Sequence, residues 1–393
     1  MKHNKLWMTA LIIEIIIIIP LLNYYRGIGN IKPSNKDIST AEENQILPVD
    51  YVGIDEAYES QLAENITTEE ELPYEEINIS MNFIGDCLLA TNEGESYENC
   101  LEAVADREDK AYFFSEVSDI FLNDSVTVGD CENVFSDSQL GVSDKGQYDV
   151  PEDSEEEFKA FWFKSRAENA EILAAGGVDI VSLDNNHTLD YGSQGKEDTR
   201  AALEAAGVEW GERSKVVYKD IEGYRLAFVF GSMYSEGAVS SIVSDLEMAK
   251  EESDYQVVYF HGGEEAVHSA ESWKIRACHT LVDNGADLVL GDHPHVLQPM
   301  EVYNGVNIVY SLGNFVFGGN RHPENRTIIF NQRLTVHRDK KSGAFEIAAS
   351  GYEIIPCYVY TGETNNWKPE IIEDEQQKKQ VIDFMNGLTD KPL

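Results

Sequence analysis

Gly285-Ala286-Asp287-Leu288-Val289-Leu290-Gly291-Asp292-His293-Pro294-His295 is the stretch that decides the fold, because it joins a buried strand to two potential metal ligands. Ala286–Leu290 is an apolar run of the length of a buried strand, and Gly291 interrupts it. Pro294 fixes the backbone between the two histidines, so the strand end can direct both imidazoles outward. The stretch therefore predicts a strand that ends in a metal site.

Similar apolar runs recur along the chain and alternate with helix-like stretches. The runs are Ile77–Phe83, Ser125–Val128, Val178–Leu183, Leu226–Phe230, Val257–Phe260 and Asn307–Tyr310, and the helical stretches are Glu157–Ala175, Gln194–Ala206, Ser241–Glu252 and His268–Asn284. This alternation predicts a layered α/β fold with central β-sheets flanked by helices. Thr327–Tyr360 then has the pattern of successive strands, which predicts an antiparallel extension or a small subdomain, and the polar C-terminus predicts a tail helix.

The first 76 residues differ from the rest in composition. Leu6–Leu22 is dominated by Leu and Ile, follows Lys2 and Lys5, and precedes no small-residue cleavage site, so residues 1–26 are predicted to be a transmembrane anchor. Residues 31–76 hold thirteen acidic and two basic side chains, which predicts a solvated, disordered stalk over residues 27–76. We expect an extracytoplasmic domain over residues 77–322 and a strand-rich extension and tail over residues 323–393.

Net charge and cysteine spacing exclude two classes of function. The 30 basic and 71 acidic side chains give a net charge of −41, which repels phosphate backbones and argues against nucleic acid as a partner. None of the five cysteines pairs with another at the two-residue spacing of zinc ribbons and redox motifs. Any metal site is therefore expected to use oxygen and nitrogen ligands.

Polar residues able to bind metal follow five of the predicted strands. They are Asp86 after the first run, Glu132 after the second, Asn185, Asn186 and His187 after the third, His261 after Val257–Phe260, and His293 with His295. Because ligands bind outside the carboxyl ends of strands in open α/β sheets, we expect these side chains to gather at one sheet edge. Asp130 is a rival to Glu132, and an Asx turn is the alternative interpretation of Asn185-Asn186.

Asp, Glu, Asn and His form a ligand set that suits manganese, iron or zinc rather than copper(I) or an iron–sulfur cluster. Two divalent ions are expected. A carboxylate shared by two ions would hold a hydroxide in line with a phosphorus or carbonyl centre, and a nearby histidine could protonate the leaving group. The sequence thus predicts metal-dependent chemistry on an ester, a phosphoester or an amide.

Three blocks of sequence give this chain a family resemblance. Val181–Gly192, Gly285–Pro299 and Tyr310–Phe315 occur in the order and form of the CapA-type capsule synthesis proteins. That family is linked to poly-gamma-glutamate capsules and is similar in fold to calcineurin-like metallophosphoesterases. The resemblance covers roughly Ile77–Gly319, and it implies a metallophosphoesterase-like domain.

The resemblance also implies roles for individual residues. It assigns Asp86 and His295 to one metal ion, Asn186, His261 and His293 to the second, Glu132 to the bridge, and His187 to general acid catalysis. The chain departs from the family pattern at five places: Leu88, Asp130-Cys131, Asp184, Gly262 and Asp292. These departures predict an altered substrate wall, a shifted metal preference and one weakened metal position.

Two functions of different classes follow from these observations. The first is a metal-dependent hydrolase or transferase that acts on an anionic surface polymer such as poly-gamma-glutamate. The second is a non-catalytic assembly or export component that works beside membrane synthase or export partners. The acidic character of the chain opposes direct binding of polyglutamate unless divalent ions bridge the like charges. A degenerate domain with structural metal ranks third.

Overall fold

The computed structural model describes residues 74–145, 160–318 and 325–392. The predicted transmembrane anchor and residues 27–73 of the predicted stalk lie outside these residues. Within the described ranges, none of the helices combines the length and the apolar composition needed to span a membrane. The first described strand, β1 (Tyr74–Cys87), includes the last three residues of the expected stalk.

The first sheet has seven strands in the order β15-β14-β13-β1-β2-β5-β6. The bounds of the other six are β2 Val126–Cys131, β5 Ile180–Ser182, β6 Glu209–Gly211, β13 Arg326–Asp339, β14 Phe345–Tyr358 and β15 Glu370–Ile371. β1, β2, β5 and β6 run parallel to one another, whereas β13 pairs antiparallel with β1 along most of its length. The C-terminal strands therefore extend the first sheet.

The second sheet has six strands in the order β11-β12-β10-β9-β8-β7. Their bounds are β7 Val217–Ile221, β8 Tyr224–Ser232, β9 Tyr255–His261, β10 Leu288–Asp292, β11 Leu297–Tyr303 and β12 Val306–Leu312. The central strands β8, β9, β10 and β12 are parallel, and antiparallel strands flank them on both sides. β7 and β11 were not expected from the sequence, because each is a short, partly exposed edge strand without a continuous apolar run.

Helices lie outside the two sheets. The α-helices are α3 Leu101–Ala105, α4 Ser118–Phe121, α5 Glu171–Ala175, α6 Gly192–Ala206, α7 Val239–Glu252, α8 Ser272–Asp283 and α9 Glu375–Met385, and the 3₁₀-helices are η1 Lys110–Phe114, η2 Ala167–Ala170 and η3 Glu236–Ala238. The expected flanking helices from Gln194, Ser241 and His268 correspond to α6, α7 and α8. The coarse prediction of an α/β fold with several sheets flanked by helices is confirmed.

The predicted helix over Glu157–Ala175 is wrong for residues 160–166, the first part of its described length. Residues 160–162 have no regular secondary structure, Phe163 forms an isolated bridge with Asn92, and β4 (Lys164–Ser165) pairs with β3 (Val134–Phe135). The backbone N–H of Trp162 donates to Asn92 Oδ1, and that of Phe163 donates to Asp190 Oδ2. These tertiary hydrogen bonds replace the helical ones, so helix formation is delayed until η2 and α5.

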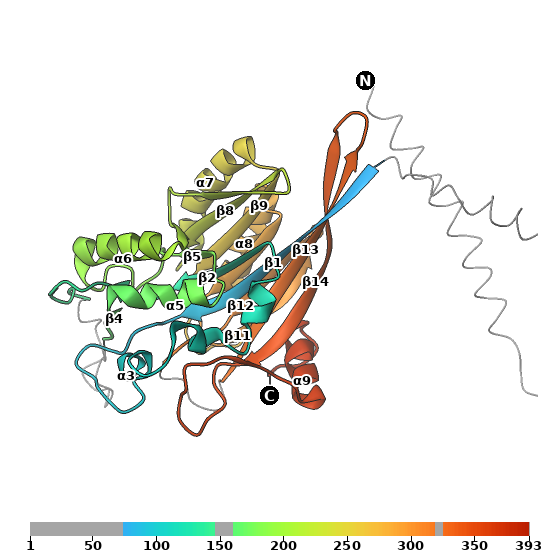
Figure 1. The fold of residues 1–393 in the computed structure, drawn as a ribbon. Coiled ribbons are helices and arrows are strands. Elements are labelled where there is room, and N and C mark those ends of the chain that lie inside the picture. The colour runs from blue at the N-terminus through green and yellow to red at the C-terminus, as the bar shows by residue number, and fades with distance from the viewer. Residues whose placement is uncertain (1–73, 146–159, 319–324, 393) are drawn as a thin grey trace, which may run out of the picture. The chain divides into compact units, whose positions relative to one another are not determined.

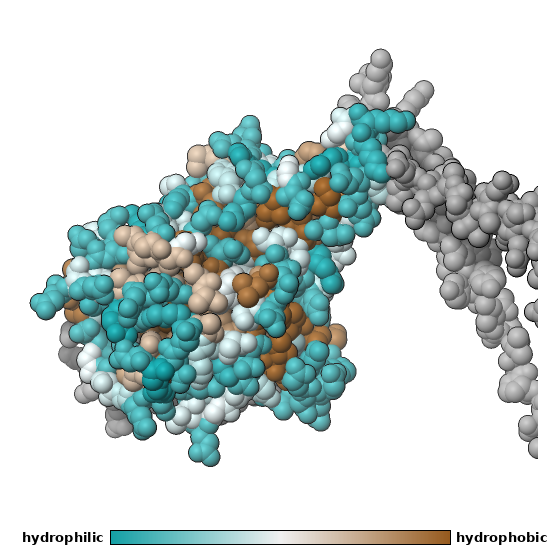
Figure 2. All heavy atoms as spheres, viewed as in Figure 1, coloured by the Kyte–Doolittle hydropathy of each residue, from teal (hydrophilic) through white to brown (hydrophobic). Residues whose placement is uncertain are grey.

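Figure 1 shows how the strands and helices are arranged, and alternating side chains explain why the two sheets stack. In β8, Leu226, Phe228 and Phe230 face the core between the two sheets, whereas Ala227 and Val229 pack under α7 and α8. Because both faces of these parallel strands are buried, their sequences are apolar without interruption. Hydrophilic side chains dominate the visible surface, and hydrophobic atoms show between them (Figure 2), as the 71 acidic residues require.

Candidate metal centre

Acidic and histidine side chains from both sheets meet at the carboxyl ends of the central strands. β1 and β2 provide Asp86 and Asp130, and Glu132 follows β2; β9 ends at His261 and β10 at Asp292, which precedes His293 and His295. The expectation of a single sheet edge is therefore wrong. Stacking of two sheets brings the ligands together, because strands of different sheets end at the same side of the interior.

Gly85 allows Asp86 to reach this position. A Cβ atom at Gly85 would lie 1.7 Å from the carbonyl oxygen of Gly313, so only glycine permits the close approach of the two segments. The backbone N–H of Asp86 donates to Gly313 O at 3.1 Å, and that of Phe315 donates to Asp86 O at 2.8 Å. The Tyr310–Phe315 block thus holds the end of β1 in place.

Both histidines around Pro294 adopt left-handed backbone conformations. Their φ angles are 92° for His293 and 59° for His295, which non-glycine residues adopt at a cost that surrounding contacts must offset. The backbone N–H of His293 lies 3.3 Å from Asp86 Oδ2. His295 Nδ1 lies 3.1 Å from the same oxygen and 2.8 Å from Asn314 Oδ1. This turn therefore gathers both histidines around the carboxylate of Asp86.

His261 is the hub of the cluster, and its two ring nitrogens face different groups. Nδ1 lies 3.0 Å from Asp292 Oδ1, 3.4 Å from Asp130 Oδ2 and 3.6 Å from Asp86 Oδ1. Nε2 faces a second set, namely Asn186 Oδ1 at 2.8 Å, His293 Nδ1 at 3.0 Å and Glu132 Oε1 at 3.2 Å. Histidines that bind metal usually donate their other N–H to a carboxylate, and Asp292 is placed to accept it.

Glu132 provides the test of whether a metal ion fits. Its side chain is 1% exposed, yet neither carboxylate oxygen accepts a hydrogen bond, and Asp130 Oδ1 also lacks one. Oε1 faces His261, and Oε2 lies 3.8 Å from His295 Nδ1. Buried carboxylate oxygens without donors are costly, and divalent cations satisfy such lone pairs. The donor set of Glu132, His261 and His293, within 4.8 Å of one another, fits such an ion.

Asp130 and Glu132 do not exclude each other as candidates. Asp86, Asp130, Glu132 and His261 form a second group whose ligand atoms lie within 4.8 Å of one another. Asp130 Oδ2 accepts a hydrogen bond from Asn185 Nδ2 at 2.9 Å, so Asn185 orients Asp130 while Asn186 points its oxygen at His261. The paired asparagines therefore have separate roles within the centre.

Proton affinities in the centre reflect the dense packing of charge. Burial and Glu132 raise the pKa of Asp86 to about 6, burial and Asp292 raise the pKa of Asp130 to about 7, and burial and Asp86 raise the pKa of Asp292 to about 8. Burial opposes ionisation of Glu132, but His295 and His261 outweigh it and lower the pKa of Glu132 to about 2. Protons on His261 and His295, whose pKa values are raised, therefore supply the positive charge that cations would otherwise bring.

His187 lies beside the cluster, and protein groups hold its ring. Its Nδ1 is 2.9 Å from Asp190 Oδ2, whose other oxygen lies 2.5 Å from Lys145 Nζ. Asp190 is fully buried and also accepts the backbone N–H of Phe163 at 2.8 Å. His187 lines a cleft of about 510 Å³ together with Asn186 and His293 of the centre. Asp190 thus fixes the ring and leaves Nε2 for proton transfer.

Sequence reasoning missed three residues of the centre and its cleft. Asp292 was noted only as a departure from the family, although it is the carboxylate partner of His261. Glu265 brings a ligand atom within 4.8 Å of those of His293 and His295, but it is an exposed acid in a highly acidic chain and gives no sequence signal. Lys145 does not stand directly after a predicted strand, and only the fold places it against Asp190.

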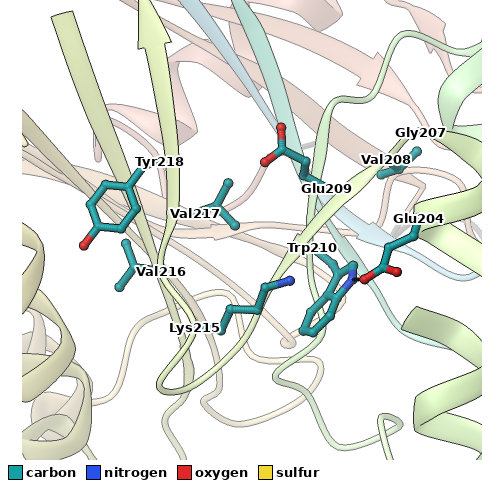
Figure 3. Close-up of a pocket in the computed structure, with 9 residues that line it drawn as sticks. All are labelled: Glu204, Gly207, Val208, Glu209, Trp210, Lys215, Val216, Val217 and Tyr218. Carbon is teal, nitrogen blue, oxygen red and sulfur yellow. Dashed lines mark hydrogen bonds between the residues drawn. The ribbon is translucent and has the colours of Figure 1, made fainter. Parts of the chain in front are cut away.

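A second hollow lies away from the centre, between the edge strands β6 and β7 (Figure 3). It measures about 460 Å³ and includes Trp210, whose Nε1 lies 3.3 Å from Glu204 Oε1. Lys215 Nζ lies 2.8 Å from the centre of the Trp210 ring, and Arg200 lies over the same ring at 4.7 Å. No group of metal-binding side chains was found there among the described residues.

Comparison with known proteins places the chain in a family. The family model described as bacterial capsule synthesis protein PGA_cap matches residues 80–319. A capsule biosynthesis protein CapA from Bacillus anthracis is 28% identical over 61% of this chain and 60% of its own length. A PGA biosynthesis protein CapA from Bacillus subtilis strain 168 is 27% identical over 62% of this chain and 64% of its own length. The chain thus spans less than two thirds of these curated relatives.

A solved structure of a hypothetical protein from Thermus thermophilus is 17% identical over 70% of this chain and 99% of its own length, with a TM-score of 0.38. That score is too low to support an argument about this chain.

Proposed function

Because the chain belongs to the bacterial capsule synthesis protein PGA_cap family, we propose that it is a metal-dependent hydrolase or transferase acting on a surface polymer. The polymer we propose is poly-gamma-glutamate or a related capsule component, in keeping with the names of the two Bacillus relatives. One observation carries the chemical part of the proposal. Both oxygens of the buried Glu132 lack hydrogen bonds and lie between His261 and His295.

The residues of the centre divide into two groups around Glu132. His261, His293 and Asn186 would hold one ion on the Oε1 side, and Asp86 and His295 would hold the other on the Oε2 side. Divalent ions at such a site supply Lewis-acid stabilisation of negative charge and lower the pKa of a coordinated water molecule. Asp292 keeps Nδ1 of His261 engaged, so Nε2 is the nitrogen directed into the centre.

The general acid of the proposed reaction is His187. Its Nδ1 faces Asp190, so Nε2 is the nitrogen that can give a proton to the leaving group of a substrate in the cleft. Lys145 pairs with Asp190 and steadies it. A buried carboxylate with these partners fixes the tautomer and the orientation of an imidazole, which is how the ring is prepared for proton transfer.

We also propose that residues 1–26 anchor the protein in the cell membrane, with the metal centre outside the cytoplasm. The apolar segment Leu6–Leu22 after Lys2 and Lys5 supports this placement. Such an anchor would hold the centre near membrane-bound synthase or export partners. Fractionation of cells that express the full chain, compared with a form starting at Tyr74, tests the anchor: only the full chain should sediment with membranes.

The decisive experiment measures bound metal and turnover in the full chain. Wild type is expected to retain manganese, iron or zinc in elemental analysis and to hydrolyse bis-p-nitrophenyl phosphate, whereas Glu132→Gln is expected to lose both properties. Glu209→Gln is the matched control, because Glu209 pairs with Lys219 at 2.6 Å on the edge strand β6. Full ion occupancy without turnover of phosphoesters or polymer would refute catalysis and favour the non-catalytic assembly role.

A further inference from the structure

The cleft beside the metal centre has the size of a ligand-binding site. Its volume is about 510 Å³, within the range of pockets that enclose small molecules. His293 and Asn186 belong both to the cleft and to the metal centre, and His187 lines the same space. A group that occupies this cleft would therefore lie next to the reacting bond.

The charge of the cleft does not match a polyanion. Among the described residues that line it, Lys145 is the one Lys or Arg, and its Nζ lies 2.5 Å from Asp190 Oδ1. Glu265 adds a negative charge to the same wall. A polyglutamate segment in the cleft would meet a neutralised lysine and a carboxylate, so electrostatic attraction would not hold it there.

Apolar side chains dominate the outer part of the cleft. Phe161, Leu189 and Tyr234 are 41%, 54% and 46% exposed, and all three line it. Phe161 stacks on Phe163 with ring centroids 6.1 Å apart, and Phe163 contacts His187 at 4.7 Å. Tyr234 stands edge-on to His293 at 5.2 Å. Large exposed apolar side chains gathered beside a catalytic centre mark a binding surface.

We propose that this cleft binds an uncharged ring, of the chemistry of a sugar, that is carried by the ester cleaved at the metal centre. A sugar ring presents an apolar face to aromatic and aliphatic side chains and polar edges to groups such as Asn186. The inference rests on the hydrolase activity in the proposed function, and it narrows the substrate to a sugar-bearing capsule component in place of poly-gamma-glutamate. The oxygen of water bonds to phosphorus, and the bond from phosphorus to the ester oxygen on the ring carbon breaks. His187 protonates that ester oxygen, and the proton released by water restores His187.

The test compares phosphate esters that differ in the ring. Full-length wild type with manganese is assayed for phosphate release from glucose 1-phosphate, cyclohexyl phosphate and isopropyl phosphate, next to the Phe161→Ala and Leu189→Ala variants. Each variant is expected to raise KM about three- to tenfold for the ring esters and less than about twofold for isopropyl phosphate. Ratios of wild type to variant cancel the intrinsic reactivity of each ester. Val302→Ala, an exposed apolar position on β11, should change none of the values.

The following results decide the matter. Equal changes in KM for the ring esters and for isopropyl phosphate would overturn the inference. Strong inhibition by a γ-glutamyl oligomer, abolished by Lys145→Met, would also overturn it. If the variants raise KM more for glucose 1-phosphate than for cyclohexyl phosphate, the cleft binds a sugar. If they raise KM more for cyclohexyl phosphate, the cleft binds a plain apolar ring, and the sugar assignment is overturned. Calorimetric measurement of binding of the same esters separates the proposed hydrolase activity from the proposed ring-binding cleft. Ring-dependent binding without turnover refutes only the hydrolase activity, and turnover without ring preference refutes only the ring-binding cleft.

Discussion

The cleft at the metal centre and the hollow around Trp210 have similar volumes, about 510 and 460 Å³, but they treat charge in opposite ways. Around Trp210, Lys215 and Arg200 lie over the indole ring, Arg200 also pairs with Glu212, and Glu204 accepts the indole N–H. At the metal centre, both buried oxygens of Glu132 lack hydrogen bonds. In the first region the charges pair with one another, although Arg200 Nε lacks a hydrogen bond, whereas in the second region the carboxylate oxygens of Glu132 face histidines.

This difference teaches that the kind of partner a buried charge has identifies a site better than the size of a hollow does. Charges that pair within the protein stabilise the fold, so changes there should affect stability and leave chemistry intact. Buried carboxylates without a partner in the protein are expected to bind a ligand. Substitutions of these residues should therefore affect ion binding and turnover. The following experiments test this division.

The largest effect is expected from His261→Ala, which removes a ligand of the proposed ion on the Oε1 side of Glu132 together with its contact to Asp292. Affinity for manganese or zinc should fall at least about 100-fold and turnover of bis-p-nitrophenyl phosphate at least about 10³-fold, because one ligand and its carboxylate contact are lost together. His279→Ala is the control, since His279 stacks on Tyr303 and contacts Glu301 instead. Unchanged metal content in His261→Ala would disprove the role of this hub.

Trp210→Ala should have the next largest effect, on stability alone. The indole is 8% exposed and carries two cations on its ring, so its removal should lower the free energy of unfolding by about 3 kcal/mol. Urea denaturation measures this change, and Trp210→Phe should recover part of it. A loss of turnover in folded Trp210→Ala would contradict the division between the two regions.

Asp190→Asn should act on turnover and leave the ions in place. The amide keeps the shape of the carboxylate but loses its charge toward His187 and Lys145, so kcat should fall about 10- to 100-fold. Elemental analysis should find the metal content of wild type. Asp254→Asn is the matched control, because Asp254 accepts the backbone N–H of Arg225 far from the centre. Loss of metal in Asp190→Asn would show that Asp190 maintains the ligands instead.

The smallest effect is a pH dependence of the ion-free protein between about pH 6.5 and 8. Burial and neighbouring carboxylates raise the pKa of Asp130 to about 7 and that of Asp292 to about 8, and Glu132 outweighs burial to raise the pKa of His295 to about 10. In this window each group binds more protons in the folded chain than in the unfolded chain, so stability falls as pH rises. Calorimetry of chelator-treated protein should show Tm falling by about 5 °C.

Manganese-loaded protein should behave in the opposite way, because ions replace these protons and bind more tightly as pH rises. The gap in Tm between the loaded and the ion-free protein should therefore widen across the same pH window. A gap that narrows over this window would show that the cluster does not exchange protons for ions.

Several features of the centre were predictable from the sequence because they depend on neighbours along the chain. Apolar runs of this length predict buried strands, and polar residues come after three of them. These residues are Asp86, His261 and the turn His293-Pro294-His295. The alternation of strands and helices predicted the layered α/β fold for the same local reason. The first part of the helix expected from Glu157 does not form, because Trp162 and Phe163 donate hydrogen bonds to Asn92 and Asp190, which are distant in sequence.

The sequence by itself thus determined which residue types stand at the strand ends and that they suit divalent ions. Only the tertiary structure decided that these ends belong to two stacked sheets, that Asp292 engages His261, and that Asp190 holds His187 against Lys145. The backbone of His293 meets the carboxylate of Asp86 across 207 positions of sequence. Local pattern fixes how a strand forms and ends, but such a contact depends on how whole sheets pack around a shared core.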